Sequence, residues 1–276
     1  MSIKTSWERS LPDCGYNLTS TLVSGTNVYA ACNGYVYLLD FETGEVRHQN
    51  PLSGYGHNEV RLAISDDGST LLVGTDGYVL GLNPSTLAKK WESDLKGSGY
   101  NIVNVLAEGT GGIGYAACNG YVYRYTISDG DVKLRNPLSG YGGHETRLAL
   151  TLKGDMLLIL HQNNLDDTGE GETRIALRDD GGVLFVGVNG YGLAVKASDI
   201  STLYTRSCGY NITDIVSGNL FTYFGCNGYV YSLDEGGNVV CTNGLPGLGK
   251  YETRLAIDTE TKEHVFVGID GYAVSL

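Results

Sequence analysis

The sequence lacks several features that mark whole classes of proteins. No apolar run approaches the length of a membrane span, and residues 1–10 are polar and charged, without the apolar centre of a secretory signal. These absences predict a soluble chain with no membrane partner. They also predict a cytoplasmic location, or secretion if a leader has been removed.

Positive charge is scarce as well. The chain has 19 Lys and Arg residues against 31 Asp and Glu residues, which gives a formal net charge of −12. Binding to nucleic acid, or to an anionic membrane surface, depends on Lys and Arg side chains that neutralise phosphates. We therefore expect neither partner.

Sequence signatures of metal and cofactor sites are missing too. The five His residues follow no metal-ligand spacing, no Gly-rich phosphate loop opens a helix, and no Ser stands in a nucleophile elbow. The sequence therefore predicts no metal site and no cofactor.

The sequence is rich in glycine and tyrosine, with 40 and 20 residues. In the stretch 30–40 an apolar run ends, Asn33-Gly34 turns the chain, and an alternating apolar run follows. Asn-Gly or Asp-Gly between two such runs is typical of a type I′ hairpin, because both central residues need φ > 0. The same turn, followed by Tyr, occurs six times, at 33–35, 76–78, 119–121, 189–191, 227–229 and 270–272. The chain is therefore a repeat protein.

Each repeat unit is predicted to form four short strands joined by sequential hairpins. In the first unit the expected strands are 19–23, 28–31, 35–40 and 45–50, with turn residues between them. Four strands of this kind make one blade of a β-propeller. We expect one domain, residues 1–276.

The two ends of the chain are predicted to share a blade. Residues 6–11 resemble 90–95, the last strand of a unit, and residues 271–276 make a third strand with no fourth strand after it. The N-terminal strand can supply that fourth strand and close the ring, which removes a free sheet edge.

Two kinds of unit alternate, and one unit is shortened. One kind opens with Gly-Tyr-Asn and the other with Glu-x-Arg followed by an apolar residue and Ala. In the region 146–172 only two strands are expected, 147–151 and 156–161, and the outer hairpin is skipped. The sequence thus predicts an all-β fold, a β-propeller with six complete four-stranded blades plus a two-stranded half-blade. The half-blade either takes a seventh place around the axis or projects from a six-fold ring.

The units 35–44 (Tyr-Val-Tyr-Leu-Leu-Asp, then Thr-Gly) and 78–91 (Tyr-Val-Leu-Gly-Leu-Asn, then Trp) resemble the repeat of quinoprotein-like, or PQQ-repeat-like, β-propellers. The resemblance covers nearly the whole chain and implies a fold rather than a chemistry. Redox members imply a bound quinone, calcium and often adjacent cysteines. No two of the six cysteines here are adjacent, so we do not expect that activity.

The Gly-Tyr-Asn and Gly-Tyr-Val repeats also resemble those of two kinds of fungal protein. One kind is lectins. The other is the cofactor-free hetero-Diels–Alderases of tropolonic sesquiterpenoid biosynthesis, and this resemblance implies a cyclase of secondary metabolism.

Candidate ligand-binding residues follow from the blade topology. The loops that enter inner strands, and the turns between second and third strands, lie on one face of a propeller, around the mouth of its central channel. A concave opening with aromatic walls and a few polar groups is the usual ligand site. The residues predicted there are Tyr16, Asn17, Tyr55, His57, Tyr100, Asn101, Tyr141, His144, Tyr210, Asn211 and Tyr251.

Four arginines are the candidate catalytic residues, because each begins an inner strand. They are Arg61, Arg147, Arg174 and Arg254. A guanidinium group near the axis would donate to a carbonyl or phenolate oxygen and stabilise negative charge that develops there. The alternative is structural: each arginine follows a Glu by two residues, on the same side of the strand, so the pair would join blades.

The cysteines also follow the repeat. Cys14 and Cys32 occupy the same places, at the same separation, as Cys208 and Cys226, so each pair could form a disulfide. Because no leader is visible, we expect reduced thiols.

Two functions fit these residues best. The first is a protein that binds one small organic ligand at the channel mouth, and in its enzymatic form a cofactor-independent cyclase that works by proximity, orientation and hydrogen bonds to an oxygen. The half-blade supports it, because a unique site requires broken symmetry. The second is a multivalent lectin, which the Tyr- and Asn-rich loops favour and the presence of two Trp residues in all disfavours. A third function is a scaffold for protein partners, but no sequence feature indicates which partner would bind. Nothing in the sequence indicates an oligomeric state.

Overall fold

The computed structural model describes residues 5–15, 20–56, 59–95, 103–108, 112–137, 147–150, 157–160, 173–177, 182–188, 191–196, 202–207, 214–218, 220–245, 247–248, 252–258, 261–262 and 264–276. Within these residues every regular element is a β-strand, and none forms a helix of the length and apolarity needed to cross a membrane. The chain divides into two compact units. We call Met1–Thr26, Glu42–Gly44 and Asn163–Leu276 the terminal unit, and Asn27–Phe41 and Glu45–Gln162 the middle unit.

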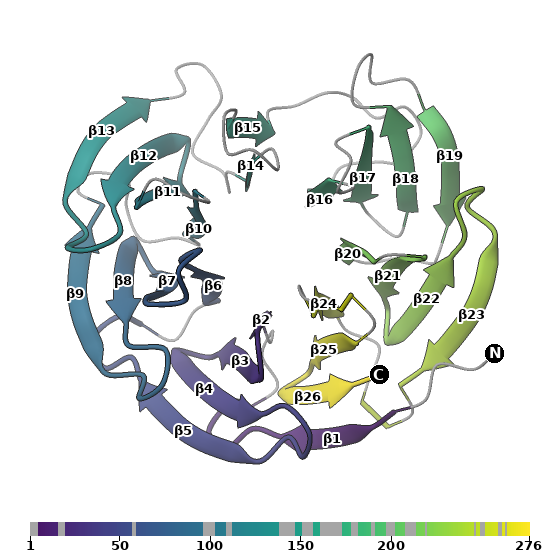
Figure 1. Cartoon of the computed structure of the whole chain (residues 1–276), viewed down its shortest axis with the longest axis horizontal. Coiled ribbons are helices and arrows are strands. Elements are labelled where there is room, and N and C mark those ends of the chain that lie inside the picture. Colours follow the sequence, from purple (N-terminus) through teal and green to yellow (C-terminus); the bar gives the residue numbers. More distant parts are fainter. Residues whose placement is uncertain are drawn as a thin grey trace. The chain divides into compact units, whose positions relative to one another are not determined.

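The strands of the middle unit follow the order of the chain (Figure 1). They are β3 (Asn27–Cys32), β4 (Tyr35–Asp40), β5 (Val46–Pro51), β6 (Arg61–Ile64), β7 (Leu71–Thr75), β8 (Tyr78–Leu82), β9 (Lys89–Asp94), β10 (Asn104–Ala107), β11 (Ile113–Cys118), β12 (Tyr121–Thr126), β13 (Val132–Pro137), β14 (Arg147–Leu150) and β15 (Leu157–Leu160).

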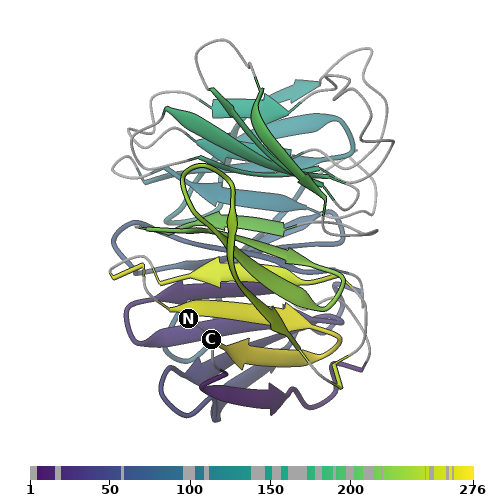
Figure 2. The ribbon, with the colours of Figure 1, turned by 90° about the vertical axis from the view of Figure 1, so that its right-hand side faces the viewer.

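The terminal unit contains strands from both ends of the chain. They are β1 (Trp7–Ser10), β2 (Ser20–Ser24), β16 (Thr173–Leu177), β17 (Val183–Val188), β18 (Tyr191–Lys196), β19 (Thr202–Ser207), β20 (Asp214–Ser217), β21 (Thr222–Cys226), β22 (Tyr229–Leu233), β23 (Val239–Gly244), β24 (Arg254–Ile257), β25 (Val265–Ile269) and β26 (Tyr272–Ser275). Figure 2 shows the yellow-green sheet β20–β23 and the yellow strands β24–β26 as neighbouring twisted sheets.

Over the described residues the strands form six four-stranded sheets and one two-stranded sheet. Their orders are β2-β3-β4-β5, β6-β7-β8-β9, β10-β11-β12-β13, β14-β15, β16-β17-β18-β19, β20-β21-β22-β23 and β24-β25-β26-β1. This is the sheet topology of a β-propeller. It confirms the predicted six complete blades and the half-blade. We call the first strand of each four-stranded blade inner and the last one outer.

The shared blade of the two chain ends is confirmed as well. Strand β1 pairs antiparallel with β26, with Trp7 opposite Ser275 and Ser10 opposite Tyr272. The amide of Leu11 donates to the carbonyl oxygen of Gly271 at 3.0 Å and extends the ladder. The N-terminal strand therefore covers the edge that β26 would otherwise expose.

The half-blade has a defined neighbour. Strand β14 lies beside β10, as β10 lies beside β6. Within the middle unit the two-stranded sheet therefore continues the row of inner strands, which favours a place of its own in the row over a projection from it.

The Asn-Gly and Asp-Gly turns adopt the conformation that the sequence predicts. In the turn at Asn33-Gly34 both residues have positive φ, 49° and 77°. Both residues also have positive φ at 76–77, 119–120, 227–228 and 270–271, while the turn at 189–190 lies outside the described residues. Because Gly has no Cβ and Asn and Asp tolerate this region best, the residue types follow from the backbone.

Apolar side chains of the second strands form the centre of each blade. Strands β7 and β25 are buried at every position, whereas the outer strand β9 alternates between exposed and half-buried positions. These two second strands are covered on both faces, so nearly all of their residues are apolar or glycine. Each fully buried Val or Leu contributes about 1.5–3 kcal/mol.

In the middle unit a Trp docks on a glycine of the next blade. The ring of Trp91, on outer strand β9, lies against Gly130, where an added Cβ would overlap it. Its Nε1 donates to the carbonyl oxygen of Ile127 at 2.8 Å, and the hydroxyl of Ser93 donates to that of Gly130. Gly130 has a φ of 74° and makes room for the ring.

The terminal unit repeats this aromatic dock twice. Tyr204 on β19 lies against Gly237, and Trp7 on β1 lies against Gly44. In both docks an arginine two residues after the aromatic residue donates its Nε to the carbonyl oxygen of the same glycine; these are Arg206 and Arg9. The blades that supply the aromatic ring are of the Glu-x-Arg kind, and those that supply the glycine are of the Gly-Tyr-Asn kind. The structural repeat is therefore a pair of blades.

The expectation of reduced thiols is wrong for two of the cysteines. Cys14 and Cys32 are both disulfide-bonded, whereas Cys118, Cys226 and Cys241 are buried and form no disulfide. Cys226 therefore does not form the second possible disulfide, with Cys208. The absence of a visible leader is a weak guide to thiol state, because a disulfide depends on the approach of two Cβ atoms in the fold.

Candidate functional site

The inner strands carry polar residues at one shared register. Arg61, Arg174 and Arg254 each lie opposite the glycine that stands two residues before a hairpin turn, at Gly74, Gly187 and Gly268. In the Gly-Tyr-Asn blades the same place is held by Asn104 and Asp214. Equivalent register means equivalent side-chain direction within a blade, so in each unit these positions hold the candidate site residues.

In the terminal unit two of the predicted arginines meet at one carboxylate. Oε1 of Glu252 accepts from Nη2 of Arg174 and pairs with Nε of Arg254. All three residues are buried, with 8 %, 7 % and 2 % of the surface exposed. A buried guanidinium group keeps its charge. The shared carboxylate therefore fixes the direction in which both planar guanidinium groups point their N–H donors.

The contact between Arg174 and Glu252 skips a blade. Strand β16 lies beside β20 and β20 lies beside β24, so the Arg174 side chain extends past the intervening inner strand. That strand contributes Asp214, whose Oδ2 accepts from the amide of Leu255 at 2.7 Å. The cluster therefore joins three neighbouring inner strands, and its arginines do more than link adjacent blades.

The loop that carries Glu252 is held at the hairpin side of the blade. The hydroxyl of Thr253 accepts from the amide of Gly228, in the Asn-Gly turn of the neighbouring blade, at 3.1 Å. The cluster thus lies on the face that the sequence predicts for ligand binding.

The other two candidate arginines are placed differently. Arg61, in the middle unit, pairs with Glu59 at 2.5 Å, and both side chains are 8 % exposed. This is the local Glu–Arg pair that the spacing predicts. Arg147 begins β14, opposite Leu160.

Tyr55 lies against the outer half of its blade. Its ring meets that of Tyr78 edge-on at 5.2 Å, and its hydroxyl bonds to Glu92 and accepts from Nζ of Lys89 at 2.8 Å. Burial, together with the hydrogen bond to Glu92, raises the pKa of Tyr55. The structure therefore directs this hydroxyl toward β9 rather than toward the inner strand β6.

The remaining predicted ligand-binding residues lie outside the described part of the chain. They are Tyr16, Asn17, His57, Tyr100, Asn101, Tyr141, His144, Tyr210, Asn211 and Tyr251. Their assignment to the site stays a prediction. Among the residues that the structure does describe, no group of three or more His, Cys, Asp or Glu could hold a metal ion.

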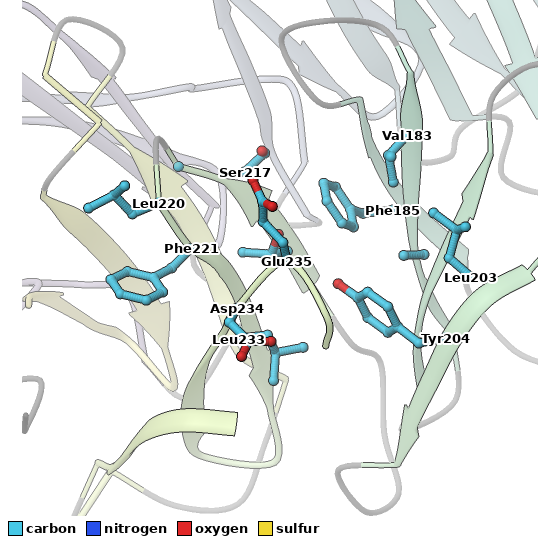
Figure 3. Close-up of a pocket in the computed structure, with 13 residues that line it drawn as sticks. Val183, Phe185, Leu203, Tyr204, Ser217, Leu220, Phe221, Leu233, Asp234 and Glu235 are labelled. Atoms are coloured by element: carbon cyan, nitrogen blue, oxygen red, sulfur yellow. The ribbon is translucent and has the colours of Figure 1, made fainter. Parts of the chain in front are cut away.

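The terminal unit also has a pocket that the sequence did not indicate (Figure 3). It opens between the blades β16–β19 and β20–β23 and contains about 450 Å³ of space continuous with solvent. Its lining residues are Val183, Phe185, Ala194, Leu203, Tyr204, Ser217, Gly218, Leu220, Phe221, Thr222, Leu233, Asp234 and Glu235. These residues come from six strands and two turns, and no sequence motif joins them.

The chemistry of the arginine cluster is that of an oxygen-binding site. Two guanidinium groups carry more N–H donors than one carboxylate can accept. Donors with fixed direction stabilise negative charge on a ligand oxygen without reorganising. The same groups also hold three inner strands together, since removal of one partner would leave a buried charge uncompensated.

Comparison with known proteins supports the fold. No protein-family model matches the chain, and no curated protein does. Among solved structures, the chain is similar to BamB from Moraxella catarrhalis, with a TM-score of 0.64 and 15 % sequence identity. The match covers 99 % of this chain and 96 % of that one. At this identity the likeness shows a shared β-propeller fold, as the resemblance to quinoprotein-like repeats implies.

Proposed function

We propose that this β-propeller binds one small organic molecule through an oxygen that is anionic or becomes so, at the Arg174–Glu252–Arg254 cluster. The observation that supports the proposal is the reach of Arg174 past β20 to a carboxylate it shares with Arg254. A repeated structural pair would need only the local Glu two residues earlier. Two converging forks instead suit a carboxylate, phenolate or carbonyl oxygen.

The enzymatic form of this proposal is a cofactor-independent cyclase of the hetero-Diels–Alderase type, as in fungal secondary metabolism. Hydrogen bonds from a guanidinium group to a substrate carbonyl withdraw electron density and favour addition across the conjugated system. Binding that holds the two reacting parts in contact would supply the rest of the rate enhancement. No residue of the site needs to act as a nucleophile.

The test uses 4-nitrophenolate, whose absorption reports both binding and ionisation. We expect about one equivalent to bind, and the pKa of the bound phenol to fall because the arginines favour its anion. Arg174→Lys keeps the charge beside Glu252 but loses the fork, so we expect roughly tenfold weaker binding. Arg206→Lys is the matched control in the same unit and should bind like the parent.

Two results would contradict the proposal. The first is a parent protein, shown folded by its melting curve, that does not bind the phenolate. The second is an Arg174→Lys protein that binds it as tightly as the parent does.

A multivalent lectin is the second candidate, and the tyrosines that follow the hairpin turns favour it. Tyr35, Tyr78, Tyr121, Tyr191, Tyr229 and Tyr272 all begin the third strand of a blade. Tyr229 is 41 % exposed and its ring stacks on Tyr231, with centroids 6.1 Å apart. The other five are half-buried, and partly accessible aromatic rings at equivalent positions suit sugar faces. A glycan array followed by titration of a bound glycan should then give several equivalent sites and a loss of one site in Tyr229→Ala, whereas binding to no glycan would exclude it.

A further inference from the structure

The pocket between blades β16–β19 and β20–β23 lies at one of the aromatic docks. Tyr204, which docks on Gly237, also forms one wall, and Figure 3 shows its hydroxyl directed into the opening. Phe185 stands on the same side as Tyr204, and Leu220 and Phe221 stand on the other. Leu220 is 75 % exposed, so the pocket is open and has an apolar rim.

The Trp91 dock of the middle unit has the same backbone arrangement with a different filling. Trp91 lies opposite Gly81, and Tyr204 lies at the same register opposite Ala194. In the middle unit the ring of Trp91 meets that of Tyr125 edge-on, with centroids 5.9 Å apart, and Tyr125 is fully buried. Large aromatic rings therefore fill that junction.

The next blades differ at corresponding places. Tyr125 lies opposite Gly114, and its counterpart Leu233 lies opposite Thr222. A Cβ added at Gly81 or at Gly114 would overlap the Trp91 or the Tyr125 ring. The middle unit thus pairs two large rings with two glycines.

The terminal unit has smaller side chains in place of the two rings and larger residues in place of the two glycines. The four replacements are Ala194, Tyr204, Thr222 and Leu233, and all four line the pocket. The pocket therefore lies at the place where, in the equivalent junction of the middle unit, the rings of Trp91 and Tyr125 meet. A flat aromatic group suits this place, because Phe185 and Phe221 offer ring contacts.

The charge at the pocket is negative. Asp234 and Glu235 both line it, and Glu235 is exposed. The Asp234 carboxylate accepts from the amide and from Nδ2 of Asn238, at 2.8 and 3.1 Å, and these bonds lower its pKa. Arg206 lowers that pKa further but donates its own Nε to Gly237. Two carboxylates beside an apolar crevice favour a cation with an apolar body.

We propose that this pocket binds a small aromatic amine, with its ring in the crevice between Tyr204, Phe185 and Leu233 and its ammonium group beside Glu235. The site is separate from the arginine cluster and favours the opposite charge. It lies on a different set of turns and shares no residue with that cluster.

The experiment compares three indoles that differ in charge: tryptamine, 3-ethylindole and indole-3-propionate. Binding to the parent is measured by isothermal titration calorimetry at neutral pH. We expect tryptamine to bind most tightly, the neutral indole more weakly and the anion most weakly. Glu235→Gln should weaken tryptamine about fivefold and leave 3-ethylindole unchanged, as expected for one exposed charge pair. Glu8→Gln, an exposed acid of the same unit away from the pocket, should change neither.

The decisive variant places the four residue types of the middle-unit junction at the equivalent positions of the terminal unit. The substitutions Ala194→Gly, Tyr204→Trp, Thr222→Gly and Leu233→Tyr together should abolish binding of tryptamine and of 3-ethylindole, with 4-nitrophenolate binding at the arginine cluster unaffected. If this protein does not melt cooperatively, Leu220→Ser at the exposed rim gives the same test. It should weaken the binding of tryptamine and of 3-ethylindole. Unchanged tryptamine binding in these variants would overturn the proposal, and so would equal affinity for tryptamine and indole-3-propionate.

Discussion

The Trp91 dock in the middle unit and the Tyr204 dock in the terminal unit share a backbone plan and differ in how they are filled. In the first, an indole and a buried phenol ring meet over two glycines. In the second, a phenol ring and Leu233 leave a pocket. The difference shows that a propeller can acquire a pocket when the large side chains at one blade junction are redistributed among the strands, without any change in strand order.

The largest effect is expected at Gly130, because its Cβ would strike the ring of Trp91. Gly130→Ala combines positive-φ strain with overpacking, and we expect a loss of about 3 kcal/mol or more. Gly112→Ala is the control: its φ is 62° but an added Cβ meets nothing within 4 Å, so we expect about 1 kcal/mol. Urea denaturation measures both. Equal losses would mean that the dock on Trp91 contributes little.

Truncation of the two docking rings tests the comparison directly. Trp91→Ala removes a packed ring and the hydrogen bond to Ile127, so we expect a loss of about 3 kcal/mol. Tyr204→Ala enlarges an existing pocket and should cost only about 1–2 kcal/mol. Similar losses in the two variants would show that the Tyr204 junction is as well packed as the Trp91 junction.

The Trp91–Tyr125 junction of the middle unit includes a hydroxyl whose removal should stabilise the folded protein. Within the described residues, Oη of Tyr125 is buried and has no hydrogen-bond partner. Tyr125→Phe should therefore raise the free energy of unfolding by about 1 kcal/mol. Tyr29→Phe is the control, because its hydroxyl donates to the carbonyl oxygen of Pro84 at 3.2 Å and its loss should destabilise.

Alkaline pH gives a second measure of the same hydroxyl. Burial raises the pKa of Tyr125, so the folded state keeps its proton while the unfolded chain releases it near pH 10. The stability contributed by the neutral form is complete below pH 10 and falls above it, by about 1.4 kcal/mol per pH unit. Tyr125→Phe should show a shallower loss between pH 10 and 11. A parallel decline in both proteins would contradict this.

The smallest effect is expected at Leu134, which occupies the docking register of Trp91 in the blade before the half-blade. Leu134 lies opposite Arg124 and is 61 % exposed. Over the residues that the structure describes, the next sheet consists of β14 and β15 alone, without outer strands to receive it. Leu134→Thr should change the free energy of unfolding by less than about 0.5 kcal/mol, by urea denaturation. A loss of more than about 1.5 kcal/mol would show that this side chain is covered.

Much of the fold follows from the sequence because turns are local. The positive φ at Asn33 and Gly34 is a property of two residues, so six repeats of the turn are enough to predict hairpins and blades. The match of 6–11 to 90–95 gave the shared blade at the chain ends in the same way, from like residues at like places.

The site was predicted less completely because its contacts join distant repeats. The spacing of Glu252 and Arg254 predicts their pair, and Arg61 pairs with Glu59 likewise. The approach of Arg174 to Glu252 spans 78 residues and depends on which inner strands are neighbours. The pocket was missed altogether, because a gap in packing is set by the volumes of side chains from separate blades. Its one signal in the sequence is the loss of the glycines opposite the large rings, at Ala194 and Thr222.

The pairing of β1 with β26 has a consequence for biosynthesis. Strand β1 is synthesised before its partner β26, and the other strands that the structure describes lie between them in the sequence. The segment Trp7–Ser10 therefore has no strand partner until residue 275 has emerged from the ribosome. The blades between β1 and β26 can form earlier, from hairpins that are neighbours in the sequence. The pairing of β1 with β26 is therefore expected to be a slow step of folding, because it joins residues that are far apart in the sequence. A translation pause late in the message would prolong the time during which that edge is open to other chains.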